Sequence, residues 1–106
     1  MAKKIGTGTY LLEHAPSAAA YAAIVGQMEG EGPLGACFDY VEQDSYFGKD
    51  SWEQAESELQ RRTVGTALQK AELTAQDIDL ILAGDLINQC TGTTYGLRGM
   101  GIPLLG

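Results

Sequence analysis

The chain has 106 residues, so it forms one domain at most. Hydrophobic residues make up 44% of it and charged residues 20%, a composition typical of a folded globular chain and not of a disordered one. Seven basic and fourteen acidic residues give a formal net charge of -7, which repels nucleic acid and anionic lipid surfaces, and we therefore exclude a nucleic-acid-binding protein.

The first quarter of the chain predicts one short strand and one ambiguous segment. Residues 7–12 suit a strand, and Pro16 ends it because a proline pushes the preceding residue out of helical geometry. Residues 17–25 combine alanines, which favour a helix, with an aromatic and two β-branched residues, which suit a strand. The segment is too short for its periodicity to decide between the two.

Residues 26–48 predict irregular structure. Residues 26–35 hold four glycines and one proline, so we expect a loop whose backbone adopts a positive φ at some position. Residues 38–48 are aromatic-rich and acidic without a clean period. We expect this part to be packed down by its aromatic side chains, Phe38, Tyr40 and Phe47.

The clearest predicted element is a helix from Ser51 to about Ala71. Ser51 with Gln54 three residues later fits a capping box, and two early glutamates favour the positive end of the helix dipole. An apolar stripe along one face consists of Ala55, Leu59, Val64, Ala67, Leu68 and Ala71. The side chains expected in solvent are Glu58, Gln60, Arg61, Arg62, Gln69 and Lys70. A helix of about 20 residues spans roughly 30 Å, enough to cover a sheet.

A buried strand is predicted after this helix, and its end is the predicted binding site. Residues 78–83 form a short apolar run, which is typical of a strand covered on both faces, and residues 74–77 predict a helical turn before it. The run breaks at Gly84, and in open α/β sheets ligands bind beyond the carboxyl ends of strands. The hydrogen-bonding side chains after the break are Asp85, Asn88 and Gln89.

The end of the chain predicts a short helix and a second strand. Residues 90–101 are rich in glycine, yet residues 94–100 could form a short helix. Another strand is predicted after Ile102 and Pro103, and the chain holds only the beginning of it. The glycine-rich stretch matches neither GxGxxG nor a P-loop, so we assign no nucleotide.

Each candidate binding residue has a structural alternative. An aspartate after a glycine is more often a turn residue, so Asp85 could bond its own backbone. Asn88 and Gln89 could equally cap the following element. Arg98 is the basic residue that an acidic domain would use to bind a small anion, although a lone arginine is more often a solvated or salt-bridged surface residue.

We predict no catalytic residue and no metal site. Cys90 lies where a nucleophile could sit, but no histidine is near in sequence and its neighbours offer no positive charge to activate a thiol. Cys37 is most simply a small buried hydrophobe. His14 is the single histidine and has no partner at metal-ligand spacing, and the cysteines form no CxxC pair.

No targeting or membrane-spanning segment is predicted either. Polar residues and Pro16 fall inside what would be the apolar region of a signal peptide. No stretch reaches the roughly 18 consecutive apolar residues that a spanning helix needs. We therefore expect any link to a membrane to come through a partner.

The residues resemble the stage V sporulation protein AD family in motif order and spacing across roughly residues 10 to 105. The motifs are Gly32-Pro33-Leu34-Gly35, Phe38-Asp39, Ser51-Trp52-Glu53 with Ala55-Glu56, Ala67-Leu68-Gln69-Lys70, Asp77-Ile78-Asp79-Leu80, Ala83-Gly84-Asp85-Leu86, Asn88-Gln89, Arg98 and Ile102-Pro103. A set of motifs this long is specific, although no single one of them is.

The resemblance implies an α/β fold of the thiolase-like type, which has two similar halves with a five-stranded sheet in each. Residues 1–106 are then expected to be an amino-terminal fragment, a partial first half with a mixed sheet and a long covering helix, incomplete at the C-terminal end. The family's cysteine at the thiolase nucleophile position follows the Ile-Pro segment, beyond this chain. Cys90 does not inherit that role.

The resemblance also implies a function. The family binds dipicolinic acid and takes part in moving it, as the calcium complex, into the forming spore and out at germination. It is a soluble component attached to a channel of other stage V sporulation A proteins, peripheral to the inner membrane of the forespore or spore. No cofactor is implied, and the family is not regarded as a working acyltransferase.

Carried over onto this chain, the matching positions nearest the expected pocket are Asp85, Asn88, Gln89 and Arg98. Two other interpretations stay open: a fragment of a thiolase-like acyltransferase, and a truncated protein-interaction module, including a homodimer.

Overall fold

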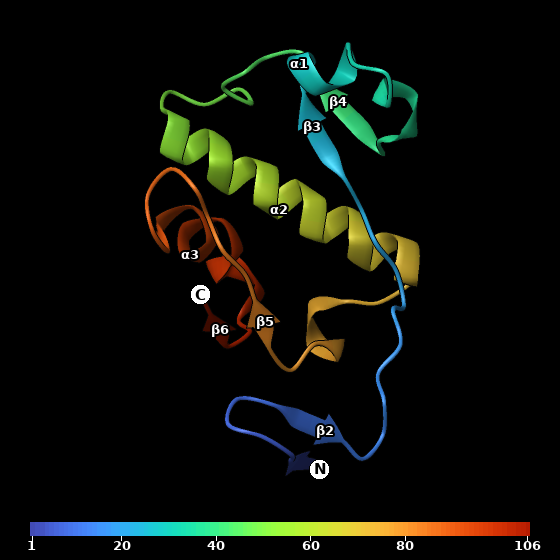
Figure 1. Ribbon diagram of the computed structural model, residues 1–106. Helices are drawn as coiled ribbons and strands as arrows, with labels where there is room; N and C mark the ends of the chain where they lie inside the picture. The colour runs from blue at the N-terminus through green and yellow to red at the C-terminus, as the bar shows by residue number, and fades with distance from the viewer.

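One long helix, α2 (Trp52–Ala71), runs through the middle of the molecule (Figure 1). The computed structural model describes residues 1–106 and shows a mixed α/β arrangement with three two-stranded sheets. Strands β3 (Ile24–Gly26) and β4 (Tyr40–Glu42) lie on one side of α2, and helix α3 (Thr91–Leu97) lies on the other. None of the helices has the length and apolar character needed to cross a bilayer.

Helix α2 begins and ends as the sequence predicts. The Ser51 side-chain oxygen accepts a hydrogen bond from the backbone N–H of Gln54 at 3.2 Å. The Gln54 side chain accepts from the backbone N–H of Asp50 at 3.2 Å. In a standard capping box it would accept from the N–H of Ser51, so the bond is made one residue earlier in the chain. At the other end Glu72 adopts a left-handed conformation, and its N–H donates to the carbonyl of Gln69.

The two parallel strand pairs are each joined by helical crossovers, as parallel pairing requires. Ile24 lies opposite Tyr40 in the β3–β4 pair, and α1 (Gln27–Gly30) with a 3-10 turn (Gly35–Cys37) connects these strands. The second pair consists of β5 (Ile81–Leu82) and β6 (Leu104–Leu105), with α3 and a 3-10 turn (Arg98–Met100) between them.

Several sequence predictions for the chain after α2 are confirmed. A 3-10 turn (Ala75–Asp77) precedes β5, and its capping box has the Thr74 N–H donating to Asp77 Oδ2 at 2.8 Å. The short helix expected over residues 94–100 is present as α3 and the turn that follows it, beginning three residues earlier. The strand expected after Ile102 is β6.

The amino-terminal predictions need correction. Within residues 7–12 only β2 (Tyr10–Leu12) is a strand, and it forms an antiparallel hairpin with β1 (Ala2–Lys4), which the sequence did not indicate. Residues 17–23 form neither helix nor regular strand. Residues 26–35 include β3's last residue and α1 rather than an open loop, and none of them has a positive φ.

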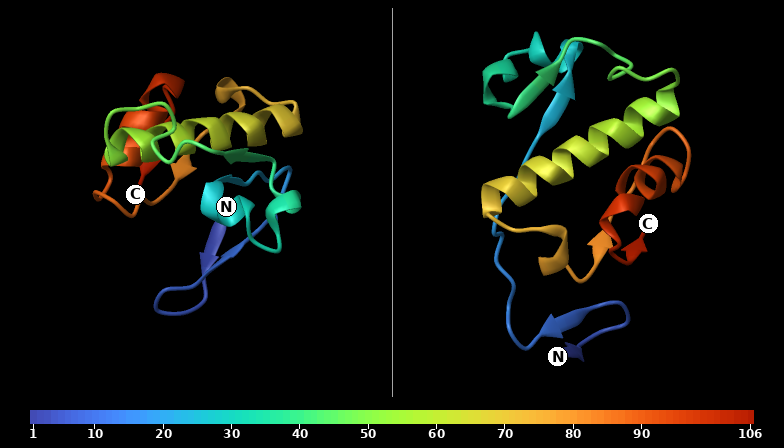
Figure 2. Two further views of the ribbon diagram at one scale, coloured as in Figure 1. Left: turned by 90° about the horizontal axis from the view of Figure 1, so that it is seen from above. Right: turned by 180° about the vertical axis from the view of Figure 1, so that it is seen from behind.

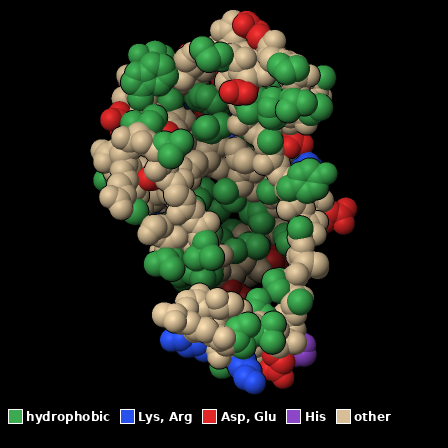
Figure 3. Space-filling model, in the orientation of Figure 1, with side chains coloured by type: hydrophobic (Ala, Val, Ile, Leu, Met, Phe, Trp, Pro, Cys, Tyr) green, Lys and Arg blue, Asp and Glu red, His purple; other side chains and the backbone are tan.

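The hydrophobic core is small and lies between β3 and α2. It consists of Ile24, Phe47 and Ala55, with Leu59 packed against it. Of the three aromatic side chains expected to pack down residues 38–48, Phe47 is buried, Phe38 is half-buried and Tyr40 is exposed. Apolar side chains are spread over the molecular surface instead (Figure 3).

The prediction of a strand buried on both faces is wrong for β5. Leu82 is 69% exposed and its partner Leu105 is 64% exposed, whereas Ile81 and Leu104 are half-buried. This alternation is that of a sheet covered on one face. An apolar run predicts burial on both faces only where other elements pack on both faces of the sheet. In this two-stranded sheet only one face is packed, so every second side chain stays exposed.

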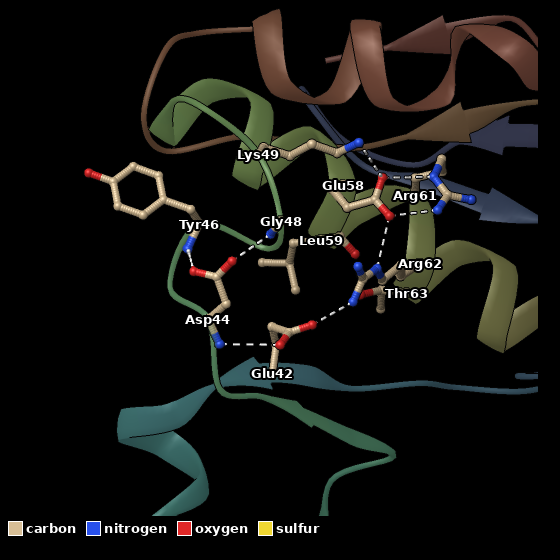
Figure 4. A network of polar contacts seen from close by, with 10 residues as sticks. All are labelled: Glu42, Asp44, Tyr46, Gly48, Lys49, Glu58, Leu59, Arg61, Arg62 and Thr63. Carbon is tan, nitrogen blue, oxygen red and sulfur yellow. Dashed lines mark hydrogen bonds and ion pairs between the residues drawn. The ribbon is translucent and has the colours of Figure 1, made fainter.

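The carboxylate of Glu58 ties α2 to the β4 side of the molecule (Figure 4). Its Oε1 accepts from Arg61 Nη2 at 2.6 Å and from Arg62 Nε at 2.9 Å, and its Oε2 accepts from Arg61 Nε at 3.0 Å. Arg62 Nη1 donates in turn to Glu42 Oε2 at 2.7 Å. Glu58 is only 9% exposed, so the expectation that it faces solvent is wrong. The side chains of Arg61, Arg62 and Lys49 surround its carboxylate.

These partners also change the acidity of Glu58. The hydrogen bonds from Arg61, with those from Arg62 and the nearby positive charges, lower the pKa of Glu58 from its ordinary value to about 2, against the opposing effect of burial. The carboxylate therefore stays charged at every pH at which the protein is ordinarily handled.

A tight turn, residues 44–48, completes this side of the fold. The carboxylate of Asp44 accepts from the backbone N–H groups of Tyr46 at 3.0 Å and Gly48 at 2.8 Å. The turn buries Phe47, which has a φ of 52°, and stacks the Tyr46 ring on Trp52 with centroids 4.3 Å apart. The loop is thereby fixed on the first turn of α2.

Helix α3 lies close against α2, which the views of Figure 2 show from two further sides. The close approach occurs at two glycines one helical turn apart. A Cβ on Gly96 would lie 2.5 Å from the backbone oxygen of Ser57, and one on Gly92 would lie 2.8 Å from Glu56 Oε2. The glycines that lower the helix propensity of α3 are the ones that let it dock.

We predict that Gly96→Ala lowers the free energy of unfolding by about 1–3 kcal/mol, because the added methyl group overlaps the α2 backbone. Thermal denaturation followed by circular dichroism measures the effect. Gly99→Ala is the matched control, since a Cβ there meets no atom within 4 Å. Equal melting temperatures for the two variants would contradict the close docking of α3.

We predict that Glu58→Gln destabilises the fold by about 1–3 kcal/mol at neutral pH. This is less than the cost of breaking a fully buried ion pair, because water screens the exposed arginine partners. The folded pKa of Glu58 is depressed from 4.5 to about 2. Its contribution is therefore complete above about pH 4.5 and is lost as the pH falls toward 2.

Chemical denaturation between pH 2 and pH 7 tests this dependence. The difference between wild type and Glu58→Gln should shrink across that window as the wild-type carboxylate takes up a proton. Glu29→Gln, which removes an exposed carboxylate without hydrogen bonds or ion pairs, should change stability little at any pH. A difference independent of pH would show that the charge of Glu58 is not what stabilises the fold.

Candidate functional site

The loop between β5 and α3 carries three of the four predicted binding residues, and Asp85 organises it. Asp85 Oδ1 accepts from the backbone N–H of Cys90 at 2.6 Å, and Oδ2 accepts from that of Thr93 at 2.9 Å. The hydrogen bond from Thr93, followed by that from Cys90, holds the pKa of Asp85 below its ordinary value. Asp85 thus caps the first turn of α3 with both carboxylate oxygens.

Two side chains of α2 hold the same loop from the other side. Glu56 accepts from the backbone N–H groups of Leu86 at 2.8 Å and Ile87 at 3.4 Å. Gln60 Nε2 donates to the carbonyl of Gly84 at 3.3 Å. These bonds satisfy backbone groups that no strand or helix pairs. The first half of the loop is therefore attached to α2.

Asn88 and Gln89 also lie in this loop, and both are exposed. Neither side chain makes a hydrogen bond, and only the backbone carbonyl of Asn88 is used, by the N–H of Thr91 at 2.9 Å. The alternative in which these side chains cap α3 is thus not what the structure has, because Asp85 performs that role. Their amide groups are free to meet a ligand.

Arg98 lies at the opposite end of α3, where it begins the 3-10 turn that follows the helix. Its guanidinium carbon lies 5.1 Å from the centroid of the Tyr95 ring, a cation–π distance. Arg98 forms no salt bridge, whereas Arg61 and Arg62 are both bound to carboxylates. It is the one arginine of the chain whose hydrogen-bond donors are uncommitted.

Arg98 lines an open groove of about 590 Å³ between the first half of α2 and α3. The residues that line it are Lys49, Glu53, Gln54, Ser57, Glu58, Arg61, Thr91, Tyr95, Gly96 and Arg98. Three of them are basic and two are acidic, so the groove has a small excess of positive charge in a chain whose net charge is -7. It is suited to a small anion more than to a cation.

The predicted site residues therefore do not line one pocket. Asp85, Asn88 and Gln89 belong to the β5–α3 loop, and of the four only Arg98 lines the groove. The sequence analysis missed Tyr95, although its i,i+3 spacing from Arg98 on a predicted helix was a usable signal. It missed Lys49 because nothing in the sequence shows that residues 49 and 98 approach the same groove.

The two cysteines are free thiols and neither lines the groove. Cys90 is half-buried with a φ of 61°, and its side chain makes no hydrogen bond. Cys37 is exposed, so the expectation of a small buried hydrophobe is wrong; it lies on a 3-10 turn outside the core. No group of three or more His, Cys, Asp or Glu side chains is placed to share a metal ion.

Comparison with known proteins identifies relatives over nearly the whole chain. A family model described as stage V sporulation protein AD matches residues 6–106. The chain is 41% identical over 103 residues to stage V sporulation protein AD of Bacillus subtilis (strain 168). That alignment covers 97% of this chain and 30% of the relative, so the chain spans less than a third of that protein's length.

We predict that Asp85→Ala frees the first turn of α3, because two backbone N–H groups lose their acceptor. Amide hydrogen exchange should show at least about a tenfold loss of protection for Cys90 and Thr93, while the amides in the middle of α2 keep theirs. Asp79→Ala, which removes an exposed carboxylate without hydrogen bonds, is the control. Unchanged protection in Asp85→Ala would rule out the capping role.

Proposed function

The chain belongs to the stage V sporulation protein AD family, and from this premise we propose that it contributes to a binding site for dipicolinic acid. The family membership supports a function in sporulation. The ligand, pyridine-2,6-dicarboxylic acid, is a small planar dianion at neutral pH. An acidic chain that binds it needs positively charged or hydrogen-bond-donating groups that compensate the negative charge of two carboxylates.

The uncommitted guanidinium of Arg98 is the observation that supports this proposal most. A guanidinium presents a planar fork of donors that matches a carboxylate in a bidentate pair. The other two arginines already donate to Glu58 and Glu42, and Lys70 donates to Asp39 at 3.0 Å. Arg98 is therefore the residue best prepared to take a new carboxylate.

The remaining predicted residues receive different roles in this proposal. Asp85 acts as a positioning residue: it fixes the start of α3, and Arg98 follows directly after that helix. Asn88 and Gln89 offer free amide groups that could bind a carboxylate or the ring nitrogen. The ligand site thus depends on α3 being held in place at its first turn.

The proposal extends to the whole protein in which this chain functions. We infer a soluble component with a thiolase-like fold that is attached to a channel of other stage V sporulation A proteins. It acts peripherally to the inner membrane of the forespore or spore, and it takes part in uptake of dipicolinate as the calcium complex and in its release at germination. We infer a binding role and no catalysis, as the resemblance to the family implies.

We predict that Arg98→Gln weakens dipicolinate binding at least about tenfold, because a charge-assisted pair is lost. Isothermal titration calorimetry with dipicolinate, with and without calcium, measures the affinity of the full-length protein that contains this chain. The chain spans less than a third of its relative's length, and we expect weak or no binding by the chain alone. Lys3→Gln removes an equal charge from the β1–β2 hairpin, away from the groove, and should bind like the wild type. Equal affinities for Arg98→Gln and wild type would contradict the role of Arg98.

A further inference from the structure

We propose that the stacked rings of Tyr46 and Trp52 form a docking surface for an arginine-bearing basic segment of a partner protein. The ring centroids lie 4.3 Å apart, with 21° between the ring planes. Tyr46 is 40% exposed and Trp52 is 49% exposed, so the pair presents aromatic surface to the solvent. Neither ring lines the groove between α2 and α3, so this surface is a second site, beyond the function proposed above.

Both rings are held in place by the fold itself. The turn that carries Tyr46 is closed by Asp44, whose carboxylate accepts from the N–H groups of Tyr46 at 3.0 Å and Gly48 at 2.8 Å. Trp52 is the first residue of α2. Figure 4 shows the Tyr46 ring turned away from the carboxylate network, toward the outside of the turn. Rigid tyrosine and tryptophan side chains lose little conformational entropy on binding and often anchor protein interfaces.

The stacked pair has no cation of its own, unlike other exposed rings of the chain. Lys70 Nζ lies 4.8 Å from the centroid of the Tyr21 ring, and Arg98 lies over Tyr95 in the same way. No lysine or arginine of the chain lies over the stacked pair. Tryptophan gives the strongest cation–π interaction of the aromatic side chains. The outer ring surface of Trp52 is therefore suited to a cation that another molecule supplies.

The charges next to the pair also favour a basic partner. Asp50 lies two residues before Trp52, Glu53 follows it directly, and all three side chains are exposed. Neither carboxylate accepts a hydrogen bond or forms an ion pair, since only the backbone N–H of Asp50 is used. The net charge of -7 adds a long-range attraction for a basic segment and repels an acidic one.

Arginine fits this surface better than lysine does. A guanidinium is planar and weakly hydrated, so it can lie flat on an aromatic ring while its edge still donates to a carboxylate. An ammonium group is a compact and strongly hydrated charge, and it loses more of its water on the same ring. We therefore assign the surface to a partner segment whose basic residues are arginines.

The test uses the full-length protein that contains this chain and fluorescein-labelled peptides with a repeated Gly-Ser-X sequence, in which X is arginine, lysine or citrulline. Citrulline keeps the shape of arginine and lacks its charge. Fluorescence anisotropy gives the dissociation constants. Wild type should bind the arginine peptide about two- to fivefold more tightly than the lysine peptide, and at least about tenfold more tightly than the citrulline peptide.

Variants then locate the binding surface. Trp52→Leu should weaken binding of the arginine peptide at least about fivefold, and Trp52→Phe should keep part of it. Asp50→Asn should weaken it about two- to threefold, and because Asp50 does not line the groove, that loss cannot arise there. Tyr10→Leu and Glu29→Gln remove an exposed ring and an exposed carboxylate elsewhere, and both should bind like the wild type.

The melting temperature from circular dichroism separates binding from stability. If Trp52→Leu melts earlier than the wild type, Asp50→Asn, which keeps both rings, decides the outcome. Equal affinities for the three peptides, or an arginine-peptide affinity unchanged in both variants, would overturn the docking surface. Analytical ultracentrifugation tests another occupant: self-association of the wild type that Trp52→Leu abolishes would assign the surface to a second copy and overturn the separate partner.

Discussion

The carboxylate of Glu58 is the interaction on which the rest of this structure depends. It joins Arg61 and Arg62 of its own helix, and through Arg62 it reaches Glu42 on β4. A chain of this length buries few side chains, and its hydrophobic cluster consists of three residues with one neighbour. The polar network therefore holds the β3–β4 layer against α2 where apolar contact alone is limited.

The same helix supports the candidate site on its other side. Gly92 and Gly96 let α3 approach the α2 backbone, and Asp85 and Glu56 fix the connection that leads into it. Arg98 follows this anchored helix and meets the groove that the Glu58 network also borders. The fold's main polar network and the proposed binding groove thus share one helix, in which Glu58 keeps Arg61 occupied while Arg98, at the other wall of the groove, forms no salt bridge.

Sequence reasoning predicts well the features that depend on neighbouring residues. The Ser51 cap, the length of α2 and the Thr74 turn are all local, and all are confirmed. It fails where distant segments decide the outcome: Glu58 looks solvent-exposed until Glu42 and Lys49 are brought to its helix, and β5 looks buried because the sequence does not show how little covers it. Of the candidate site, Arg98 could be selected from the sequence as a bidentate donor at a position that matches the family's motifs, whereas the groove could not be predicted.

The measurement that tests the account most directly is a titration of the isotope-labelled full-length protein that contains this chain with dipicolinate, followed by nuclear magnetic resonance. The account predicts chemical-shift changes that concentrate on the groove, at the Arg98 guanidinium, the Tyr95 ring and the Lys49 side chain. Shift changes confined to the β5–α3 loop around Asn88, or their absence at all ligand concentrations, would contradict it.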